Sequence, residues 1–251
     1  MKRLPNKKLT TQELDLLIED NLYDYGGEAI ICTTNNPHSV YKIFVYPGTN
    51  IPDRMSDNKL RKVSYYYQND ITGLIKPLST LENNGDLIGY ETTFDSTNTS
   101  LLDSLLTPSE IFSCLNQSKD ILEYLATKDI TYGDVTSDNL LVNARTKKVT
   151  FCDIDNTRVG EYPIDVMSDS LSNYVFSRRA ADSTIDAYMH NLLTLEQLYF
   201  RNASYTEIVR KLRAGQNPIE ADQLASRIIT SMQDPPNFTG EYVLPYIKQK
   251  R

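Results

Sequence analysis

The sequence predicts an α+β fold, in which a small, mostly antiparallel β-sheet lobe with one helix precedes a larger, mainly helical lobe. Residues 23–94 carry short β-branched and aromatic runs separated by Asn-, Gly- and Pro-containing turns. After residue 107, apolar side chains recur at helical spacing. The polar stretch Asp95–Ser100 is typical of a linker between the two patterns. A chain of 251 residues is long enough for one large domain or two modest lobes.

The first 22 residues are expected to form a helical extension. Thr10 and Glu13 have the spacing of a capping box, in which each side chain satisfies a free backbone N–H group of the first turn. Leu14, Leu17 and Ile18 then repeat at helical spacing, so we expect a helix to about Asp20 that packs on the following domain.

Residues 23–94 are expected to form the smaller lobe. The runs 29–33 and 40–45 flank an Asn- and Pro-containing turn, which predicts a hairpin. The segment 56–68 predicts one helix. Its expected inner face consists of Leu60, Val63 and Tyr67. Two more strands, 71–81 and 86–94, are joined by the tight-turn sequence Asn83-Asn84-Gly85-Asp86.

Residues 95–235 are expected to form the larger lobe. A second capping box, Thr107 with Glu110, starts a helix that continues to about Lys128. Short strands follow at 140–142 and 149–151. Further helices are expected at 183–199, 205–214 and 219–232. Asp234-Pro235-Pro236 ends the last helix, and residues 236–251 form a partly polar tail.

Composition excludes several classes of function. The net charge of −7 and the pI near 5.0 argue against a nucleic-acid-binding surface. Three widely spaced cysteines and two histidines, His38 and His190, predict neither a disulfide framework nor a zinc site. There is no apolar run of about 18 residues and no secretory signal at the N-terminus, so a cytoplasmic protein without a membrane span is expected.

Two short runs carry the chemistry of the chain: Tyr132–Asn139 and Cys152–Asp155. They place Asp134 five residues before Asn139, and a pair of short strands then delivers Asp153. Phosphoryl transfer requires an in-line acceptor, a base close to it, and metal ions that neutralise the phosphate oxygens. These three side chains are of the types that could position magnesium and a nucleophile.

The order of these motifs resembles the protein-kinase-like superfamily from about Tyr23 to Gln233, in the form of a minimal bacterial- or phage-type kinase. The resemblance implies a bilobal fold that binds ATP and Mg²⁺. Asp134 would be the catalytic base, while Asn139 and Asp153 would hold the metal. Asp155, in place of the Gly of D-F-G, would either bind metal as well or cap the following turn.

Other positions match the same family. Lys42, in Val40-Tyr41-Lys42-Ile43, would contact the α- and β-phosphates and assist catalysis. Gly26 and Gly27 stand where the phosphate-covering glycine loop belongs. The strand that ends in Glu91-Thr92-Thr93 resembles the hinge, so Glu91 and Thr93 would contact adenine through backbone groups. Asp186 would brace the catalytic loop.

The chain also departs from the family pattern. Gly133 replaces the Arg of H-R-D, and the Tyr-Gly-Asp form is similar to small-molecule kinases of the aminoglycoside and choline type. Thr136 replaces the Lys that protein kinases place against the γ-phosphate. The helix from Ser56 lacks an evident Glu to pair with Lys42.

The expected activity is ATP- and Mg²⁺-dependent transfer of the γ-phosphoryl group to a hydroxyl acceptor, with a protein Ser/Thr side chain as the leading acceptor. The chain would then have ATP and a protein substrate as partners, without nucleic acid or membrane. Two alternatives stay open, a small-molecule phosphotransferase and a nucleotide-binding pseudokinase scaffold. Adenylyl transfer by the same machinery is a further possibility, and the sequence gives no oligomeric state.

Overall fold

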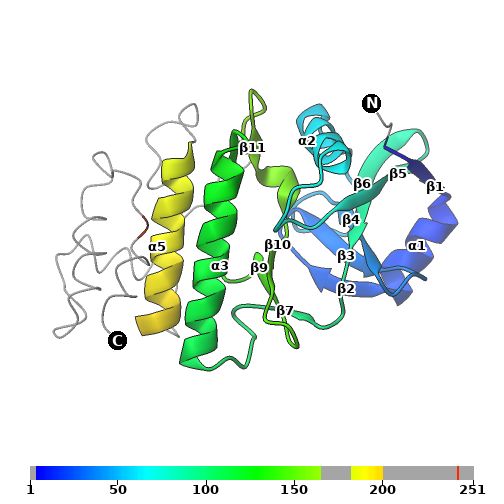
Figure 1. Cartoon of the computed structure of the whole chain (residues 1–251). Helices are drawn as coiled ribbons and strands as arrows, with labels where there is room; N and C mark the ends of the chain where they lie inside the picture. The colour runs from blue at the N-terminus through cyan, green and yellow to red at the C-terminus, as the bar shows by residue number, and fades with distance from the viewer. Residues whose placement is uncertain (1–3, 165–181, 200–241, 243–251) are drawn as a thin grey trace. The chain divides into compact units, whose positions relative to one another are not determined.

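A computed structural model describes residues 4–164, 182–199 and 242 of the chain (Figure 1). It divides into two compact units, Met1–Asn98 and Thr99–Arg251. The expectation of a mixed α+β chain is confirmed, because the described residues form one six-stranded sheet, two smaller sheets and four α-helices. The helices expected at 205–214 and 219–232 lie outside the described residues.

The first unit is built on the six-stranded sheet, in the order β1-β5-β6-β4-β3-β2. Its strands are β1 (Asn6–Leu9), β2 (Leu22–Tyr25), β3 (Ala29–Thr33), β4 (Ser39–Phe44), β5 (Pro77–Asn83) and β6 (Asp86–Thr93). All neighbours are antiparallel except β1 and β5. Both expected hairpins are confirmed, and the β5–β6 turn has positive φ at Asn84 (50°) and Gly85 (91°), as a tight two-residue turn requires.

Strands β1 and β2 were not expected from the sequence. Strand β1 has the sequence Asn-Lys-Lys-Leu and is largely exposed, so it lacks the apolar alternation that marks a half-buried strand. It joins the sheet through parallel pairing with β5, for example Asn6 opposite Thr80. Residues before the first helix therefore belong to the sheet. Tertiary pairing decides the conformation of such a polar edge segment, and local pattern does not.

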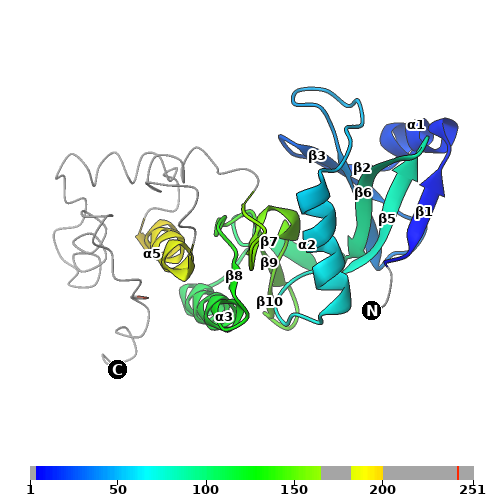
Figure 2. The ribbon, with the colours of Figure 1, turned by 90° about the horizontal axis from the view of Figure 1, so that it is seen from above.

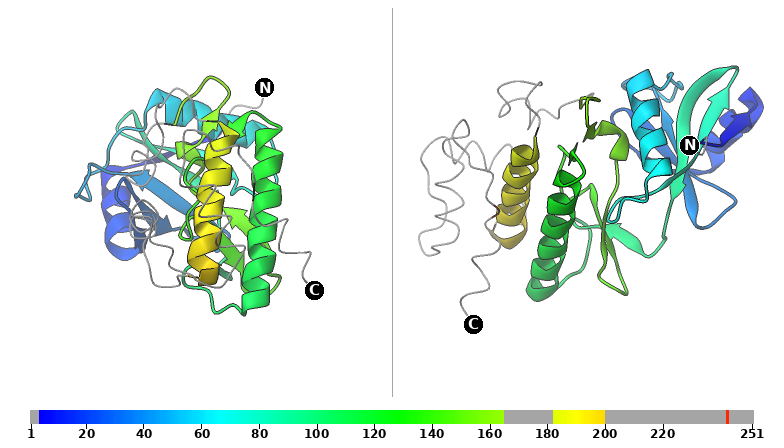
Figure 3. Two further views of the ribbon diagram at one scale, coloured as in Figure 1. Left: turned by 90° about the vertical axis from the view of Figure 1, so that its left-hand side faces the viewer. Right: turned by 45° about the horizontal axis from the view of Figure 1, so that its top comes forward.

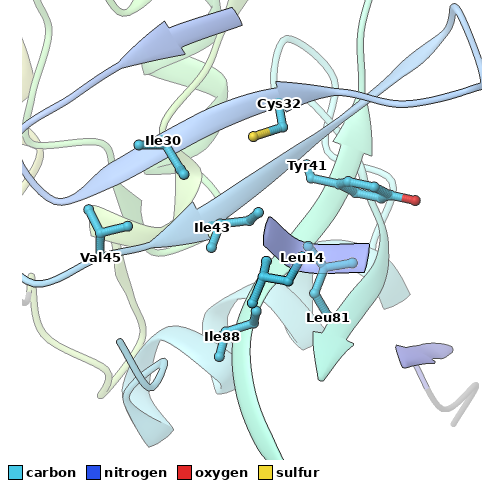
Figure 4. Packing of buried hydrophobic residues seen from close by; sticks show 8 residues of the cluster. All are labelled: Leu14, Ile30, Cys32, Tyr41, Ile43, Val45, Leu81 and Ile88. Carbon is cyan, nitrogen blue, oxygen red and sulfur yellow. The ribbon is translucent and has the colours of Figure 1, made fainter. Parts of the chain in front are cut away.

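Helix α1 (Thr11–Asp20) begins with the expected capping box of Thr10 and Glu13. Its Leu14 is buried among side chains of β3, β4, β5 and β6 (Figure 4). The cluster also contains Ile30, Cys32, Tyr41, Ile43, Val45, Leu81 and Ile88. The expectation that this helix packs on the domain is confirmed.

Helix α2 (Asp57–Gln68) lies on the other face of the sheet (Figure 2), with Ser56 as its N-cap. The prediction of its inner face was partly wrong, because Leu60 and Tyr67 are only half-buried. The buried residues are Lys59, Lys62, Val63 and Tyr66. Lysine can take part in such a face because its aliphatic stem packs while its ammonium finds polar or aromatic partners.

In the second unit, α3 (Pro108–Ala126) and α5 (Ser183–Tyr199) lie side by side (Figure 3). Strands β9 (Leu140–Asn143) and β10 (Val149–Phe151) form the expected hairpin. Strand β7 (Asn98–Ser100) pairs with β9, so part of the expected 95–100 linker is a strand. Its Asn-Thr-Ser sequence carries no apolar signal that would have revealed it.

Three short elements also belong to the second unit. Strand β8 (Ile130–Thr131) pairs with β11 (Arg158–Val159), and the 3₁₀ turn η1 (Ile154–Asn156) follows β10. The three cysteines are free thiols, as expected, with Cys32 and Cys114 buried. Within the described part of the chain, no helix is long and apolar enough to cross a membrane.

Candidate functional site

The segment between β8 and β9 brings two of the expected site residues into direct contact. The Asn139 side-chain amide donates to the Asp134 carboxylate oxygen Oδ2 at 2.9 Å and to the Asp134 carbonyl at 3.1 Å. The Thr136 backbone N–H also donates to that carbonyl, at 2.9 Å. Because Nδ2 of Asn139 points to Asp134, its side-chain carbonyl Oδ1 faces away and accepts from the Cys152 thiol, with 3.9 Å between Sγ and Oδ1.

Asp186 of α5 braces the start of this loop, as expected. Its carboxylate is fully buried and accepts the backbone N–H of Tyr132 at 2.8 Å and that of Gly133 at 2.7 Å. Burial raises the pKa of Asp186 to about 7, against the opposing effect of these two N–H groups. Two oxygens accepting two N–H donors fix the backbone immediately before Asp134.

Gly133 is required at its position in this loop. Its φ is +82°, in the left-handed region that favours glycine, and an added Cβ would lie 2.5 Å from Cδ1 of Ile164. The backbone at this position therefore does not accommodate a side chain without strain.

Tyr132 links the loop to the segment that carries Asp153. Its hydroxyl donates to the Cys152 carbonyl, and its ring packs on Phe151 with 4.6 Å between centroids. Burial raises the pKa of the Tyr132 hydroxyl well above its usual value, and the charges of Cys152, Asp153, Asp134 and Asp155 raise it further. The hydrogen bond of Tyr132 thus ties the loop of Asp134 to the segment that carries Asp153, and the convergence of the two carboxylates remains a prediction.

Asp153 and Asp155 have different environments. Asp153 is half-buried, and its backbone is left-handed, with φ 56° and ψ 47°. Asp adopts this region more readily than most non-glycine residues, and Asn84, Asp129 and Lys147 also have positive φ. Asp155, in η1, is only 1% exposed. The Cys152 backbone N–H donates to the Asn139 carbonyl at 3.0 Å, so Asp153 directly follows a residue bound to Asn139.

The donor atoms fit a hard cation such as Mg²⁺, which prefers carboxylate and amide oxygens. Asn139 supplies Oδ1, and Asp153 supplies a carboxylate that makes no capping hydrogen bond to η1. No group of three or more His, Cys, Asp or Glu side chains suited to a metal occurs among the described residues. Magnesium is usually bound through one or two protein carboxylates together with water and substrate oxygens.

The first unit holds the other expected site residues. Gly26 and Gly27 form the turn of the β2–β3 hairpin, where the Gly26 N–H donates to the Ala29 carbonyl at 2.9 Å. A Cβ added at Gly27 would meet nothing within 4 Å, so the turn is open on that side. Lys42 lies in β4, as expected, with its ammonium 5.6 Å from the centre of the Phe44 ring.

Glu91 and Thr93, the residues expected to contact adenine, lie within β6. The Glu91 carboxylate accepts from the hydroxyls of Ser39 at 2.7 Å and Ser79 at 3.0 Å. The Thr93 N–H donates to the Lys76 carbonyl at 2.9 Å. That N–H is therefore used inside the sheet, and adenine contacts by these residues remain a prediction.

Sequence reasoning missed a polar cluster under α2. The Lys59 ammonium lies 2.9 Å from Oε2 of Glu28 and 4.3 Å from the centre of the Phe44 ring. Lys62, one turn further along the helix, is fully buried. Positions 59, 62, 63 and 66 have helical spacing, so the stripe was visible in the sequence once lysine is allowed on an inner face.

Comparisons with known proteins do not place the chain in a family. No family model matches the sequence, and no curated protein matches it.

Proposed function

We propose that this chain is an ATP- and Mg²⁺-dependent phosphotransferase with a bilobal, protein-kinase-like fold. The contact between Asp134 and Asn139 carries the proposal, because it joins an acid and an amide in a loop braced by Asp186. The hydrogen bond from the Tyr132 hydroxyl to the Cys152 carbonyl, which ties this loop to the segment that carries Asp153, is the second support. The acceptor we favour is a protein Ser/Thr hydroxyl.

Each candidate site residue of the second unit has a role in this proposal. Asp134 accepts the proton of the acceptor hydroxyl and orients its oxygen. The Asn139 amide holds the Asp134 carboxylate in place through Nδ2. Mg²⁺ would be held by Asp153 and by Oδ1 of Asn139. When bound, the ion neutralises the negative charge of the phosphates. Asp155 is almost fully buried, so we assign it to stabilising the η1 turn rather than to binding metal.

The residues of the first unit bind the nucleotide in this proposal. Lys42 contacts the α- and β-phosphates, and the open turn at Gly26 and Gly27 covers them. Glu91 and Thr93 belong to the strand that leads to the adenine contacts. The three free thiols agree with a reducing compartment such as the cytoplasm.

Specific observations favour each of two alternative functions. The close contact of Gly133 with Ile164 agrees with the Gly-containing loop of small-molecule kinases. None of the buried residues of α2 is acidic, so this described helix offers no buried Glu to Lys42, which favours a nucleotide-binding pseudokinase scaffold.

Mass spectrometry after incubation with Mg²⁺ and ATP tests the proposal. The protein, a generic protein acceptor and a panel of hydroxylated metabolites are assayed in parallel. We expect a phosphate mass on the protein acceptor, which Asp134→Asn and Asp153→Ala abolish. Asp138→Asn, a matched change at an exposed residue of the same loop, should leave transfer intact.

The other outcomes identify the alternatives. An adenylate mass would mean that the chain transfers adenylyl groups. Phosphate found only on a metabolite would identify a small-molecule kinase. A thermal shift with Mg²⁺-ATP but no transfer would identify a scaffold. Full transfer by Asp134→Asn or Asp153→Ala would show that the roles given to these residues are wrong.

A further inference from the structure

The α2 side of the six-stranded sheet carries two lysine ammonium groups over one aromatic ring. Nζ of Lys59 lies 4.3 Å from the centre of the Phe44 ring, and Nζ of Lys42 lies 5.6 Å from it. Both ammonium groups therefore lie against the same ring. Lys42 comes from β4, whereas Lys59 comes from α2, the helix on which the family pattern would place an acid.

The ion pair of Lys59 and Glu28 is asymmetric. The Lys59 side chain is only 10% exposed, whereas that of Glu28 is 46% exposed. The packed helix therefore fixes the cation, and the carboxylate reaches it from the solvent side. Glu28 directly follows Gly26 and Gly27, the turn that has open space around Gly27.

A half-exposed carboxylate is an exchangeable partner. Pairs in contact with solvent contribute little free energy, because water and salt compete for both charges. A phosphate group offers more negative charge and several strong acceptor oxygens, and its hydrogen bonds to ammonium groups are charge-assisted. A phosphate that enters beside the glycine turn could therefore displace Glu28 from Lys59.

We propose that Lys59 is a second phosphate-binding cation, in addition to Lys42. Glu28 competes with the phosphate for the Lys59 ammonium. The ligand is the polyphosphate chain of a nucleotide, which rests on the proposed function. In the kinase pattern, an acid on this helix pairs with the strand lysine, which is Lys42 here. Under this proposal, Lys59 stands on the helix instead of that acid and contacts the ligand directly. Glu28 lowers the affinity of the site and keeps weaker anions from it.

The proposal predicts effects of opposite sign from the two partners of one ion pair. Lys59→Met should weaken the binding of tripolyphosphate and of Mg²⁺-ATP by about tenfold or more, since it removes a charge-assisted contact. Glu28→Gln should tighten both severalfold, because the competing charge is gone. If the pair were only a structural brace, both variants would weaken binding or leave it unchanged.

Isothermal titration with tripolyphosphate, and separately with Mg²⁺-ATP, measures these effects. Lys59→Arg keeps the charge and should retain binding. Lys76→Met and Asp70→Asn are the matched controls, since Lys76 and Asp70 form an exposed ion pair at 3.3 Å in the same unit. Thermal unfolding confirms that each variant is folded. If Lys59→Met does not fold, Glu28→Gln decides alone, because it leaves the cation in place.

The outcomes separate this proposal from the proposed function. Binding that weakens in Lys59→Met and tightens in Glu28→Gln supports it. Unchanged or uniformly weaker binding in both variants overturns it, while the phosphotransferase proposal stands if the wild type still transfers phosphate. If the wild type binds tripolyphosphate but transfers no phosphate, the anion site at Lys59 is supported and the phosphotransferase proposal is contradicted. A wild type that binds neither ligand would overturn both.

Discussion

Replacement of Asp186 by Asn tests how the 132–139 loop is held. In the wild type, both carboxylate oxygens accept a backbone N–H, from Tyr132 at 2.8 Å and from Gly133 at 2.7 Å. Asparagine has nearly the same size but only one acceptor oxygen, so its NH₂ group would face one of the two donors. Above the pKa of Asp186, about 7, the variant loses a charge-assisted hydrogen bond and leaves a buried N–H without an acceptor, so the comparison is made at about pH 8.

The expected loss is about 3 kcal/mol, because hydrogen bonds to charged groups contribute roughly 1.5–3 kcal/mol and an unsatisfied buried donor adds its own penalty. This loss corresponds to a rise of about a hundredfold in the equilibrium constant for local opening of the loop. Amide hydrogen exchange of Tyr132 and Gly133, followed by NMR, measures that opening residue by residue. We also expect the transfer activity to fall, since Asp134 follows directly.

The matched control is Asp182→Asn at the start of the same helix. The Asp182 side chain accepts the Thr184 N–H at 2.9 Å, as an N-cap residue does. Asp and Asn are nearly equivalent N-caps, so exchange in the loop should not change. Amides of Tyr132 and Gly133 that exchange as slowly in Asp186→Asn as in the wild type would refute the bracing role.

Two further substitutions test the packing of each unit. Gly89→Ala would place a Cβ 2.1 Å from the Lys42 carbonyl oxygen and should destabilise the first unit by about 3 kcal/mol in urea unfolding, whereas Gly27→Ala, which meets nothing within 4 Å, should be nearly neutral. Equal stability of the two variants would contradict the close approach of β4 and β6. Burial lowers the pKa of His190 to about 4, so between about pH 6.5 and 4 the unfolded chain binds the extra proton and stability falls as pH falls, by about 3 kcal/mol in total. His190→Gln should remove this slope in urea unfolding at a series of pH values; the raised pKa of Asp186 acts with the opposite sign and cancels in the comparison. An unchanged slope would mean that His190 does not titrate in this way.

The sequence predicted those elements that carry a local signal. Both capping boxes and the Asn84-Gly85 turn have specific side-chain or backbone requirements, and all three are present. Strands β1 and β7 are polar and short, so only their pairing partners define them. Pattern analysis in a single sequence has no access to such long-range pairing.

For the candidate site, the sequence placed Asp134 and Asn139 in one short loop, and the hydrogen bond between their side chains is a finding of the structure. The bracing by Asp186 was also predictable, because the motif order fixes which helix follows the loop. The Glu28–Lys59 pair was missed, since lysine is rarely buried and apolar periodicity assigns it to the outer face. Distant charge pairs depend on the tertiary fold, and composition does not reveal them.

A crystal structure with Mn²⁺ and a non-hydrolysable ATP analogue tests the central claim most directly. The account predicts the metal, located by its anomalous signal, on Asn139 and Asp153, with Asp134 beside the γ-phosphate and Lys42 on the phosphate chain. A nucleotide bound elsewhere, or carboxylates of Asp134 and Asp153 that face separate regions of solvent with Lys42 remote from the phosphates, would contradict it.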